Sequence, residues 1–202
     1  MIIGILGVQG NIQEHADSTK AAMKRLRISG DVIIVKNSED LKKCDGLIIP
    51  GGESTTIWKL MNKTDIFSHI EYFAKQGKPI FGTCAGLIVL AKEGNSQVKK
   101  TGQKLLKLMD IGVNRNAFGR QRDSFSVDIE IPEVSKKPFH CVFIRAPAIE
   151  KTWGDAKVLA MYKDKIVAVR QGNLLGLSFH PELTDDTKFH EYFLKMVSGQ
   201  NH

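Results

Sequence analysis

The chain contains few cysteines and no long hydrophobic run, and each shortage excludes a class of protein. Its three cysteines, Cys44, Cys84 and Cys141, are an odd number and form no C-x-x-C pair. That pattern argues against a disulfide framework and against a zinc knuckle, and it suits a reducing compartment. Glycine, glutamine or asparagine interrupts the uncharged stretches within about ten residues, well short of a membrane span. We therefore expect a cytoplasmic protein without a membrane partner.

Several short signatures are also missing. The N-terminal segment has no basic region and no cleavage-like site, so residues 2–8 are interpreted as a buried strand and not as a signal peptide. Neither the H-E-x-x-H spacing of a metal site nor the phosphate-binding G-x-x-x-x-G-K-[ST] loop is present. The sequence therefore predicts no metal site and no cofactor.

The chain has an excess of positive charge. Its 29 Lys and Arg residues face 22 Asp and Glu residues, which gives a formal net charge of +7. A basic surface can bind nucleic acid, but the lysine doublets are isolated and lack the interleaved aromatic residues of single-strand binders. We favour a solvated basic surface and expect no nucleic-acid partner.

The remaining composition is that of a globular protein. The hydrophobic fraction of 42% and the charged fraction of 25% exclude disordered and fibrous classes. A chain of 202 residues fills one hydrophobic core. We expect a single domain that spans residues 1–202.

Strand and helix patterns alternate along the first half of the chain. Buried strands are predicted at residues 2–8, 31–35 and 45–50. Helices are predicted at residues 11–29, 38–43, 57–61 and 64–77, and Thr19 lies on the inward face of the first. Because the strands are apolar on both faces, the alternation favours a mostly parallel sheet with helices on both sides.

The second half contains more strands and shorter connections. Residues 125–131 alternate between apolar and polar side chains, the period of a half-exposed strand. Further strands are predicted at residues 140–144, 157–162, 166–171 and 174–179, followed by a helix at 187–198. Residues 92–107 are polar and without a clear period, so we expect a surface excursion there. The predicted fold is a three-layer α/β structure whose central sheet gains antiparallel strands in the C-terminal half.

The most informative motif is Gly82-Thr-Cys84-Ala-Gly86, which lies between two apolar runs. It is the thiol counterpart of the G-x-S-x-G elbow, in which small residues permit a strained strand-to-helix turn that exposes a nucleophile. A helix N-terminus also favours a thiolate over a thiol. The alternative is that Cys84 is a buried cysteine acting as a small hydrophobic residue.

A glycine pair follows the third predicted strand. Gly51 and Gly52 allow a ligand to approach the backbone at the carboxyl end of that strand, where open α/β sheets bind ligands. Ser54 or Thr55 is expected to cap the next helix. The alternative is a tight turn without a ligand.

A cysteine nucleophile needs a base, and residues 178–182 supply one. If this segment is extended, His180 and Glu182 project to the same side, so the carboxylate can orient the imidazole. The alternative is a surface His–Glu pair. The other histidines are less promising: His15, His69 and His190 lie on helical patterns where solvated or partner-facing positions are expected, and His140 opens a buried strand.

Together these motifs resemble the class I (triad) glutamine amidotransferases. Within that class, four segments resemble the glutaminase subunit of pyridoxal 5′-phosphate synthase: LIIPGGESTT at residues 47–56, RNAFGRQ at 115–121, FIRAP at 143–147 and SFHPELT at 178–184. The resemblance extends from about residue 4 to residue 197, and only residues 95–107 match nothing that can be placed. PGGEST is narrowly specific to this subunit.

The resemblance implies a role for each matching residue. Cys84 is the nucleophile, His180 the general base and then acid, and Glu182 the carboxylate that orients the base. The implied glutamine pocket consists of Gly52, Glu53, Ser54, Arg115, Ile144 and Arg145. The oxyanion donors are expected to be the backbone amides of Gly51, Gly52 and Ala85.

The function implied is hydrolysis of L-glutamine to glutamate and ammonia through a cysteine thioester. The ammonia then passes to a separate synthase subunit, which condenses it with a pentose phosphate and a triose phosphate. Activation on docking is also implied, and residues 11–15 are the expected contact, with a simple helix cap as the alternative. Two other functions stay open: a stand-alone cysteine hydrolase of γ-glutamyl substrates, and a non-catalytic basic binding protein.

Overall fold

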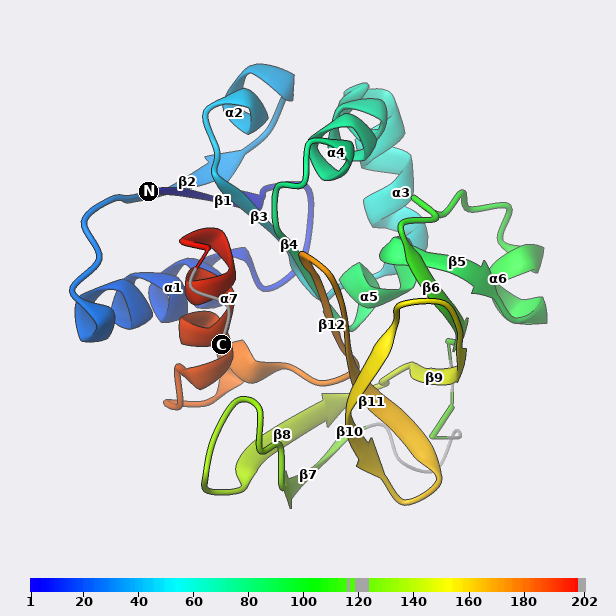
Figure 1. The fold of residues 1–202 in the computed structure, drawn as a ribbon. Coiled ribbons are helices and arrows are strands. Elements are labelled where there is room, and N and C mark those ends of the chain that lie inside the picture. The colour runs from blue at the N-terminus through cyan, green and yellow to red at the C-terminus, as the bar shows by residue number, and fades with distance from the viewer. Residues whose placement is uncertain (116, 119–123, 200–202) are drawn as a thin grey trace.

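A large central sheet organises the computed structural model, which describes residues 1–115, 117, 118 and 124–199. Its ten strands in the described residues are β1 Ile2–Leu6, β2 Asp31–Val35, β3 Gly46–Ile49, β4 Ile80–Thr83, β5 Ala91–Gly94, β6 Met109–Asn114, β9 Ala148–Thr152, β10 Lys157–Tyr162, β11 Lys165–Gln171 and β12 Leu174–Leu177. Their order is β2-β1-β3-β4-β12-β11-β9-β6-β5, and β10 pairs with β11 beside this path (Figure 1).

The sheet combines a parallel half with a mixed half. Strands β2, β1, β3, β4 and β12 are parallel neighbours. Strands β9, β10 and β12 all run antiparallel to β11, and β9 is also antiparallel to β6. The α/β class and the antiparallel strands of the C-terminal half are thereby confirmed. Because β4 and β12 lie side by side, Cys84 and the segment after residue 177 leave the sheet at the same edge.

Helices cover both faces of the sheet, as the sequence predicted. They are α1 Ile12–Leu26, α2 Ser38–Lys42, α3 Ser54–Lys63, α4 Ile66–Lys75, α5 Ala85–Leu90, α6 Ser96–Lys100 and α7 Lys188–Val197, with a short 3₁₀ turn, η1, at Pro181–Leu183. Helices α1 and α7 lie together against one face, and α2 to α5 cover the other (Figure 1).

Alternating side chains of the central strands create two cores. In β3, Leu47 and Ile49 join the core under α2 to α5, whereas Ile48 points into the core under α1 and α7. In β4, Ile80 and Phe81 divide in the same way. Successive side chains of a strand point to opposite faces, so a strand covered on both sides must be apolar throughout. This explains the uninterrupted hydrophobic runs of the first half.

Two predicted strands do not join the central sheet. Strands β7 Ser124–Ile129 and β8 Phe139–Ile144 form a separate two-stranded antiparallel sheet, so their expected place in the central sheet was wrong. Phe125 and Phe143 stack at 4.7 Å between ring centroids. Phe139 meets Phe189 of α7 edge to face at 4.8 Å. The aromatic side chains therefore attach this hairpin to the core under α7, and neither of its strands pairs with a strand of the central sheet.

The polar segment at residues 92–107 is more structured than its sequence indicated. Part of β5 and all of α6 lie in it, and β5 pairs in parallel with β6. Asn95 caps α6 by accepting a hydrogen bond from the Val98 amide at 3.2 Å. Val98 and Leu106 are buried. The expected surface excursion is thus a docked element, anchored by two apolar side chains that are too far apart to show a period.

The described residues contain neither a candidate membrane span nor a candidate metal site. None of their helices combines the length and apolarity needed to cross a membrane. No group of three or more His, Cys, Asp or Glu side chains among them could hold a metal ion.

Candidate active site

Cys84 occupies the predicted strained turn between β4 and α5. Its backbone angles are φ 49° and ψ −102°, which non-glycine residues rarely adopt. The Cys84 amide donates to the Leu177 carbonyl at 2.8 Å, which ties the turn to the end of β12. The residue is 7% exposed. The elbow therefore holds the thiol at the carboxyl edge of the sheet and at the N-terminus of a helix.

The small residues on either side of Cys84 are required by close backbone approaches. A Cβ atom on Gly86 would lie 2.1 Å from the Ile49 carbonyl oxygen, and one on Gly82 would lie 2.7 Å from the Gly86 carbonyl carbon. Either contact is shorter than van der Waals packing permits. Glycines at both positions thus let α5 begin directly above β3 and β4.

His180 and Glu182 lie beside this turn, although not on an extended segment. Strand β12 ends at Leu177, and residues 181–183 form the 3₁₀ turn η1 that begins at Pro181. The turn brings Glu182 Oε1 to 2.8 Å from His180 Nδ1. The His180 amide also donates to the Val142 carbonyl of β8 at 2.8 Å. The expected pairing is present, but a turn and not strand alternation produces it.

The surroundings of His180 favour its protonated form. Burial lowers its pKa, but a hydrogen bond from the ring to Cys84, a second to Glu182 and both negative charges outweigh burial and raise the pKa to about 10. The Glu182 carboxyl is the complement: burial raises its pKa, and His15, His180 and Asn11 together lower it to about 2. Near neutral pH the site therefore contains an imidazolium between a carboxylate and a cysteine sulfur.

The start of α1 also contacts the carboxylate. Asn11 Nδ2 donates to Glu182 Oε1 at 2.9 Å and lies 3.3 Å from His180 Nδ1. Asn11 occupies the N-cap position of α1 but makes no capping hydrogen bond with its side chain. The simple helix cap considered for this residue is thereby excluded, because its amide group binds the His–Glu pair instead.

A cavity of about 520 Å³ opens beside Cys84. Its lining consists of Gly52, Glu53, Ser54, Cys84, Ala85, Ile88, Gln97, Thr101, Arg115, Arg145 and Pro147. The volume falls in the range of small-molecule sites. The cavity thus gathers five of the six predicted pocket residues, and the exception is Ile144.

Glu53 and Arg115 are bound to each other within this cavity. Arg115 Nη2 forms an ion pair with Glu53 Oε1, while Glu53 Oε2 accepts from the Thr56 amide at 2.9 Å and the Thr56 hydroxyl at 2.8 Å. Partial burial raises the pKa of Glu53, but the hydrogen bonds from Thr55 and Thr56 lower it to about 2. Glu53, and not Ser54 or Thr55, therefore caps α3, which corrects the expected cap.

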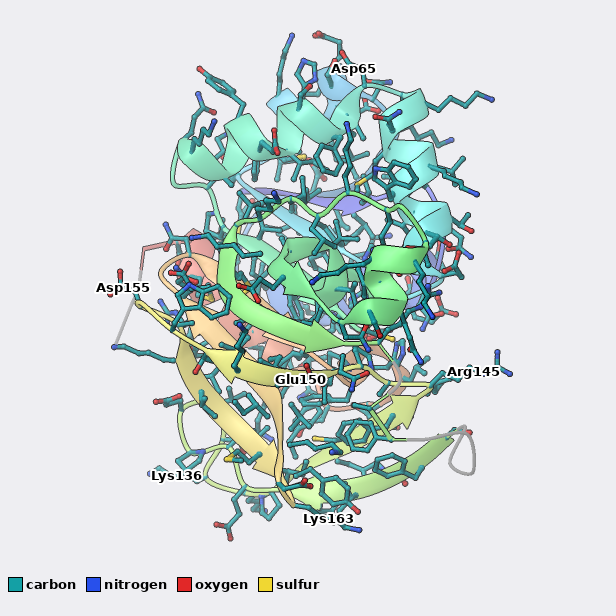
Figure 2. The ribbon with its side chains drawn as sticks, turned by 90° about the vertical axis from the view of Figure 1, so that its right-hand side faces the viewer. Asp65, Lys136, Arg145, Glu150, Asp155 and Lys163 are labelled. Carbon is teal, nitrogen blue, oxygen red and sulfur yellow. The ribbon has the colours of Figure 1, made fainter. Side chains whose placement is uncertain are left out.

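The remaining predicted pocket residues occupy distinct positions. The Ser54 hydroxyl is buried and donates to Gln103 Oε1 at 2.9 Å. Ile144 is 40% exposed and does not line the cavity, while its carbonyl oxygen lies 3.9 Å from Cys84 Sγ. Figure 2 shows Arg145 at the edge of the molecule, just beyond β8, and its φ of 43° is another uncommon backbone angle.

The glycine loop touches the reactive groups directly. A Cβ on Gly51 would lie 2.4 Å from His180 Cε1 and 3.2 Å from Cys84 Cβ, so only glycine fits between them. The Glu53 amide donates to Gln9 Oε1 at 2.9 Å, and this hydrogen bond holds the peptide group between Gly52 and Glu53. Ala85 is the first residue of α5, where backbone amides have no intrahelical partner. An oxyanion site formed by Gly51, Gly52 and Ala85 stays a prediction compatible with these positions.

Comparison with known proteins identifies the family. The model of the SNO glutamine amidotransferase family matches residues 5–199. The chain belongs to this family. A pyridoxal 5′-phosphate synthase subunit PdxT from Archaeoglobus fulgidus is 53% identical over 97% of this chain and 98% of its own length. The PdxT subunit from Pyrococcus furiosus is 52% identical over 96% of this chain and 98% of its length.

Solved structures agree with this SNO family assignment. A crystal structure described as a glutamine amidotransferase superposes with a TM-score of 0.86 at 42% identity, covering 98% of this chain and all of the other. A Trypanosoma brucei CTPS glutaminase domain with bound acivicin has a TM-score of 0.64 at 14% identity and covers 100% of this chain and 95% of the other. That second likeness shows the shared fold alone.

Several residues of the SNO family site were missed or misplaced from sequence. His15 and His190 are fully buried, so the expectation that they are solvated or partner-facing was wrong. The sequence did indicate that His15 is buried, because His15 precedes Thr19 by one helical turn and Thr19 was placed on the buried face. Gln97 and Thr101 line the cavity from the segment that was expected to be a surface excursion. Their polar pattern gave no indication of it. His140 is exposed and pairs with Asp128 at 2.6 Å, away from Cys84.

Proposed function

We propose that this chain hydrolyses L-glutamine with Cys84, His180 and Glu182, and supplies the ammonia to a synthase subunit that makes pyridoxal 5′-phosphate. The observation that carries the proposal is the juxtaposition of a strained cysteine elbow with a buried His–Glu pair in a member of the SNO glutamine amidotransferase family. The PdxT subunits similar to this chain support the assignment to pyridoxal phosphate synthesis. We also expect the protein to reside in the cytoplasm.

The first half of the reaction uses the protonated imidazole. The Cys84 sulfur attacks the side-chain amide carbon of glutamine, and the carbonyl electrons move to an oxygen stabilised by the proposed amides of Gly51, Gly52 and Ala85. When the tetrahedral centre collapses, the C–N bond breaks and His180 gives its proton to the departing nitrogen. Ammonia leaves, and a γ-glutamyl thioester remains on Cys84. A His180 pKa of about 10 suits this acid role.

The second half requires His180 to become a base. Once Cys84 is acylated, its negative charge no longer raises the imidazole pKa, whereas burial still lowers it. His180 can then accept a proton from water as the water attacks the thioester carbon. Collapse releases glutamate and returns the sulfur and the imidazolium to their starting state. Glu182 orients the ring throughout and transfers no proton.

The cavity beside Cys84 is the proposed glutamine pocket. Arginine guanidinium groups can bind the α-carboxylate of glutamine, and carboxylate or carbonyl oxygens can accept hydrogen bonds from its α-ammonium group. Arg145 and the Glu53–Arg115 pair supply charges of both signs on the wall of this cavity. Arg115 is bound to Glu53, so we assign it the positioning of Glu53 and of the α3 N-terminus. We assign the α-carboxylate to Arg145 because Arg145 also lines this cavity and adds a second positive charge to its wall.

Docking to the synthase is proposed to occur at the start of α1. Within residues 11–15, Gln13 and Glu14 are exposed, while His15 is buried and Asn11 reaches the triad. A partner at this surface would therefore contact the helical turn that also holds Glu182. We expect the isolated chain to be a poor glutaminase that becomes active on docking, because ammonia is useful only where its acceptor is bound.

The decisive test supplies glutamine labelled with ¹⁵N in its amide to this chain and the matching synthase subunit, with pentose and triose phosphates and unlabelled ammonium. We expect glutamate release to rise as the synthase is titrated and ¹⁵N to appear in pyridoxal phosphate despite the unlabelled competitor. A Cys84→Ala chain should give neither. Synthase-independent glutamate release with ¹⁵N only in bulk ammonia would instead indicate a stand-alone γ-glutamyl hydrolase.

A further inference from the structure

Two fully buried histidines connect α1 and α7 to the carboxylate of the triad. His15 of α1 places Nε2 at 3.3 Å from Glu182 Oε2 and at 3.0 Å from Thr83 Oγ1, next to the cysteine elbow. Its other ring nitrogen, Nδ1, lies 3.0 Å from His190 Nε2 of α7. Both imidazoles are 0% exposed. The glutamine reaction described above uses neither ring directly, so these buried polar groups need another explanation.

Burial and geometry fix the proton positions in both rings. Burial lowers the pKa of His15 more than the neighbouring Glu182 carboxylate raises it, and burial likewise lowers the pKa of His190 to about 3. Both imidazoles are therefore neutral near pH 7. The His15 nitrogen that faces the anionic Glu182 oxygen must carry its ring proton, because a lone pair there would repel the carboxylate. His15 Nδ1 is then an acceptor, and His190 Nε2 must donate to it.

This arrangement places a polar group from the start of α1 beside each oxygen of Glu182. Asn11 Nδ2 and His180 Nδ1 lie at 2.9 Å and 2.8 Å from Oε1. The second oxygen, Oε2, is buried and receives no regular hydrogen bond within the described residues; its polar contact there is His15 Nε2. Asn11 and His15 are four residues apart and thus share one face of the helix. The first turn of α1 therefore holds the carboxylate at both oxygens.

We propose that His15 is a positioning residue for the triad: its Nε2–H group holds Glu182 through Oε2, and His190 locks His15 in the tautomer that can do so. The carboxylate is thereby kept ionised and oriented toward His180 without a second positive charge beside the imidazolium. This inference rests on the proposed Cys84–His180–Glu182 mechanism. It assigns His15 no contact with glutamine, because His15 does not line the cavity beside Cys84.

The titratable groups around this contact are few. Glu182 faces His15 from α1 and His180 from its own segment, and Cys84 lies beyond His180. His15 faces Glu182, His180, His190 of α7 and its own neighbour Glu14. Loss of the His15 donor leaves the Glu182 anion less stabilised, so its pKa rises. The acid limb of activity, where Glu182 becomes protonated, should then move to higher pH.

The test compares His15→Met, which has similar bulk but no N–H donor, with His15→Gln, whose terminal amide reaches about as far as Nε2. Each variant is assayed for glutamine hydrolysis with the matching synthase subunit across pH. We expect His15→Met to lower kcat about 10- to 100-fold, the usual effect of losing a donor to a charged group, with KM within about twofold of the parent. Its acid limb should shift upward, and His15→Gln should recover most of both changes.

Thr19→Val serves as the packing control, since the Thr19 hydroxyl donates to the His15 carbonyl at 2.7 Å on the same buried face. It should lower the melting temperature without moving kcat or the acid limb. Equal losses in His15→Met and His15→Gln, or an unshifted acid limb in His15→Met, would overturn the proposal. The triad itself is judged separately by Cys84→Ala, so the two failures can be told apart.

A measurement on the unsubstituted protein covers the case in which the His15 variants do not fold. ¹⁵N chemical shifts of the histidine rings report which nitrogen carries a proton. We expect His15 to be neutral with the proton on Nε2, and His190 to be neutral with the proton on Nε2. A charged His15, or a His15 ring protonated only on Nδ1, would contradict the proposed contact with Glu182.

Discussion

His180 and Glu182 have different duties in the proposed triad, and their replacements should differ in cost. His180 transfers protons in both half-reactions, whereas Glu182 orients the ring across a 2.8 Å hydrogen bond. We expect His180→Asn to lower kcat roughly a million-fold and Glu182→Gln roughly ten-thousand-fold, by analogy with triads in which base and carboxylate were removed singly. Steady-state glutamate release with saturating synthase measures both. Equal activity of Glu182→Gln and the parent would remove the carboxylate from the mechanism.

The two cavity arginines should separate in their kinetic effects. Arg145→Ala is expected to raise KM for glutamine at least tenfold with a smaller change in kcat, because a lost charged hydrogen bond weakens binding by about 1.5–3 kcal/mol. Arg115→Ala releases Glu53 as well, so we expect both KM and kcat to worsen.

The measurement for this pair of variants is initial glutamate release over a range of glutamine concentrations. Lys151→Ala is a matched control, since this exposed cation pairs with Glu93 and does not line the cavity. Unchanged KM and kcat in both arginine variants would exclude Arg115 and Arg145 from the glutamine site.

Individual site residues were predictable where a short motif marked them. Cys84 stands out because glycines two residues away on each side announce a strained turn, and the structure gives it a positive φ. Asn11 and His15 carry no comparable mark. Their contacts with Glu182 join positions about 170 residues apart in the chain, and such proximity depends on how α1 packs beside η1. The pairing of Glu53 with Arg115 was hidden for the same reason.

Helix α1 links the proposed docking surface to the triad, so a surface charge there should affect activation without affecting chemistry. Glu14 is exposed in the first turn of α1, next to buried His15. We expect Glu14→Lys to weaken binding to the synthase. The synthase concentration that gives half-maximal glutaminase activity should rise at least tenfold. The rate at saturating synthase should stay close to that of the parent.

Asp31→Lys is the matched control for this charge reversal, because Asp31 is exposed at the start of β2 and therefore at the opposite, amino-terminal end of the parallel strands. It changes the net charge equally. Glutamate release is measured in the same titration with the synthase. If the two variants need equal amounts of synthase, the proposed docking surface at α1 is wrong.

Elements with a strong period were predicted well, and those fixed by distant packing were not. Helix α1 and strands β1 to β3 follow their hydrophobic patterns closely. The alternation in β7 correctly indicated a strand, but it contains nothing that selects a partner, and aromatic packing placed β7 and β8 outside the central sheet. The 3₁₀ turn η1 was missed because the His-Pro-Glu sequence is equally compatible with an extended segment until Glu182 finds its partners.

The stability of the whole molecule should depend on pH through its buried histidines. His190 has a pKa near 3 in the folded chain against 6.5 in the unfolded chain, so the unfolded state binds more protons between these values. Its contribution is therefore complete above pH 6.5 and is lost progressively as the pH falls toward 3. Glu182 has a pKa of about 2 in the folded chain against 4.5 in the unfolded chain, so it adds a further loss of stability as the pH falls below 4.5. Between pH 6.5 and 4.5 the histidines account for the expected slope.

Thermal unfolding between pH 6.5 and 4.5 measures this slope, because His180, whose folded pKa is about 10, is protonated in both states over most of this range. We expect His190→Phe, which keeps an aromatic ring beside Phe81, to reduce the fall in melting temperature as the pH is lowered. Part of the fall should remain, because burial also lowers the pKa of His15. His69→Gln, at a half-buried site on α4, is the control and should resemble the parent. A slope that is the same in all three proteins would show that His190 does not bear the predicted buried, neutral ring.

The family and the overall architecture were both accessible from the sequence alone. The motifs around Cys84 and His180 lie nearly a hundred residues apart, yet parallel strands β4 and β12 end side by side. That adjacency is a property of the fold and not of either motif. Recognising the family supplied it in advance, whereas strand patterns alone left the order of strands open.

The central claim is that glutamine is cleaved through a thioester on Cys84, and trapping that intermediate tests it most directly. The chain is mixed with its synthase subunit and glutamine, quenched in acid during turnover, digested and analysed by mass spectrometry. We predict a γ-glutamyl group on the peptide that contains Cys84 in the parent. Cys84→Ala should show no adduct and no glutamate release, while Cys44→Ala should retain both. Glutamate release from Cys84→Ala, or a glutamyl group carried by another residue, would contradict the account.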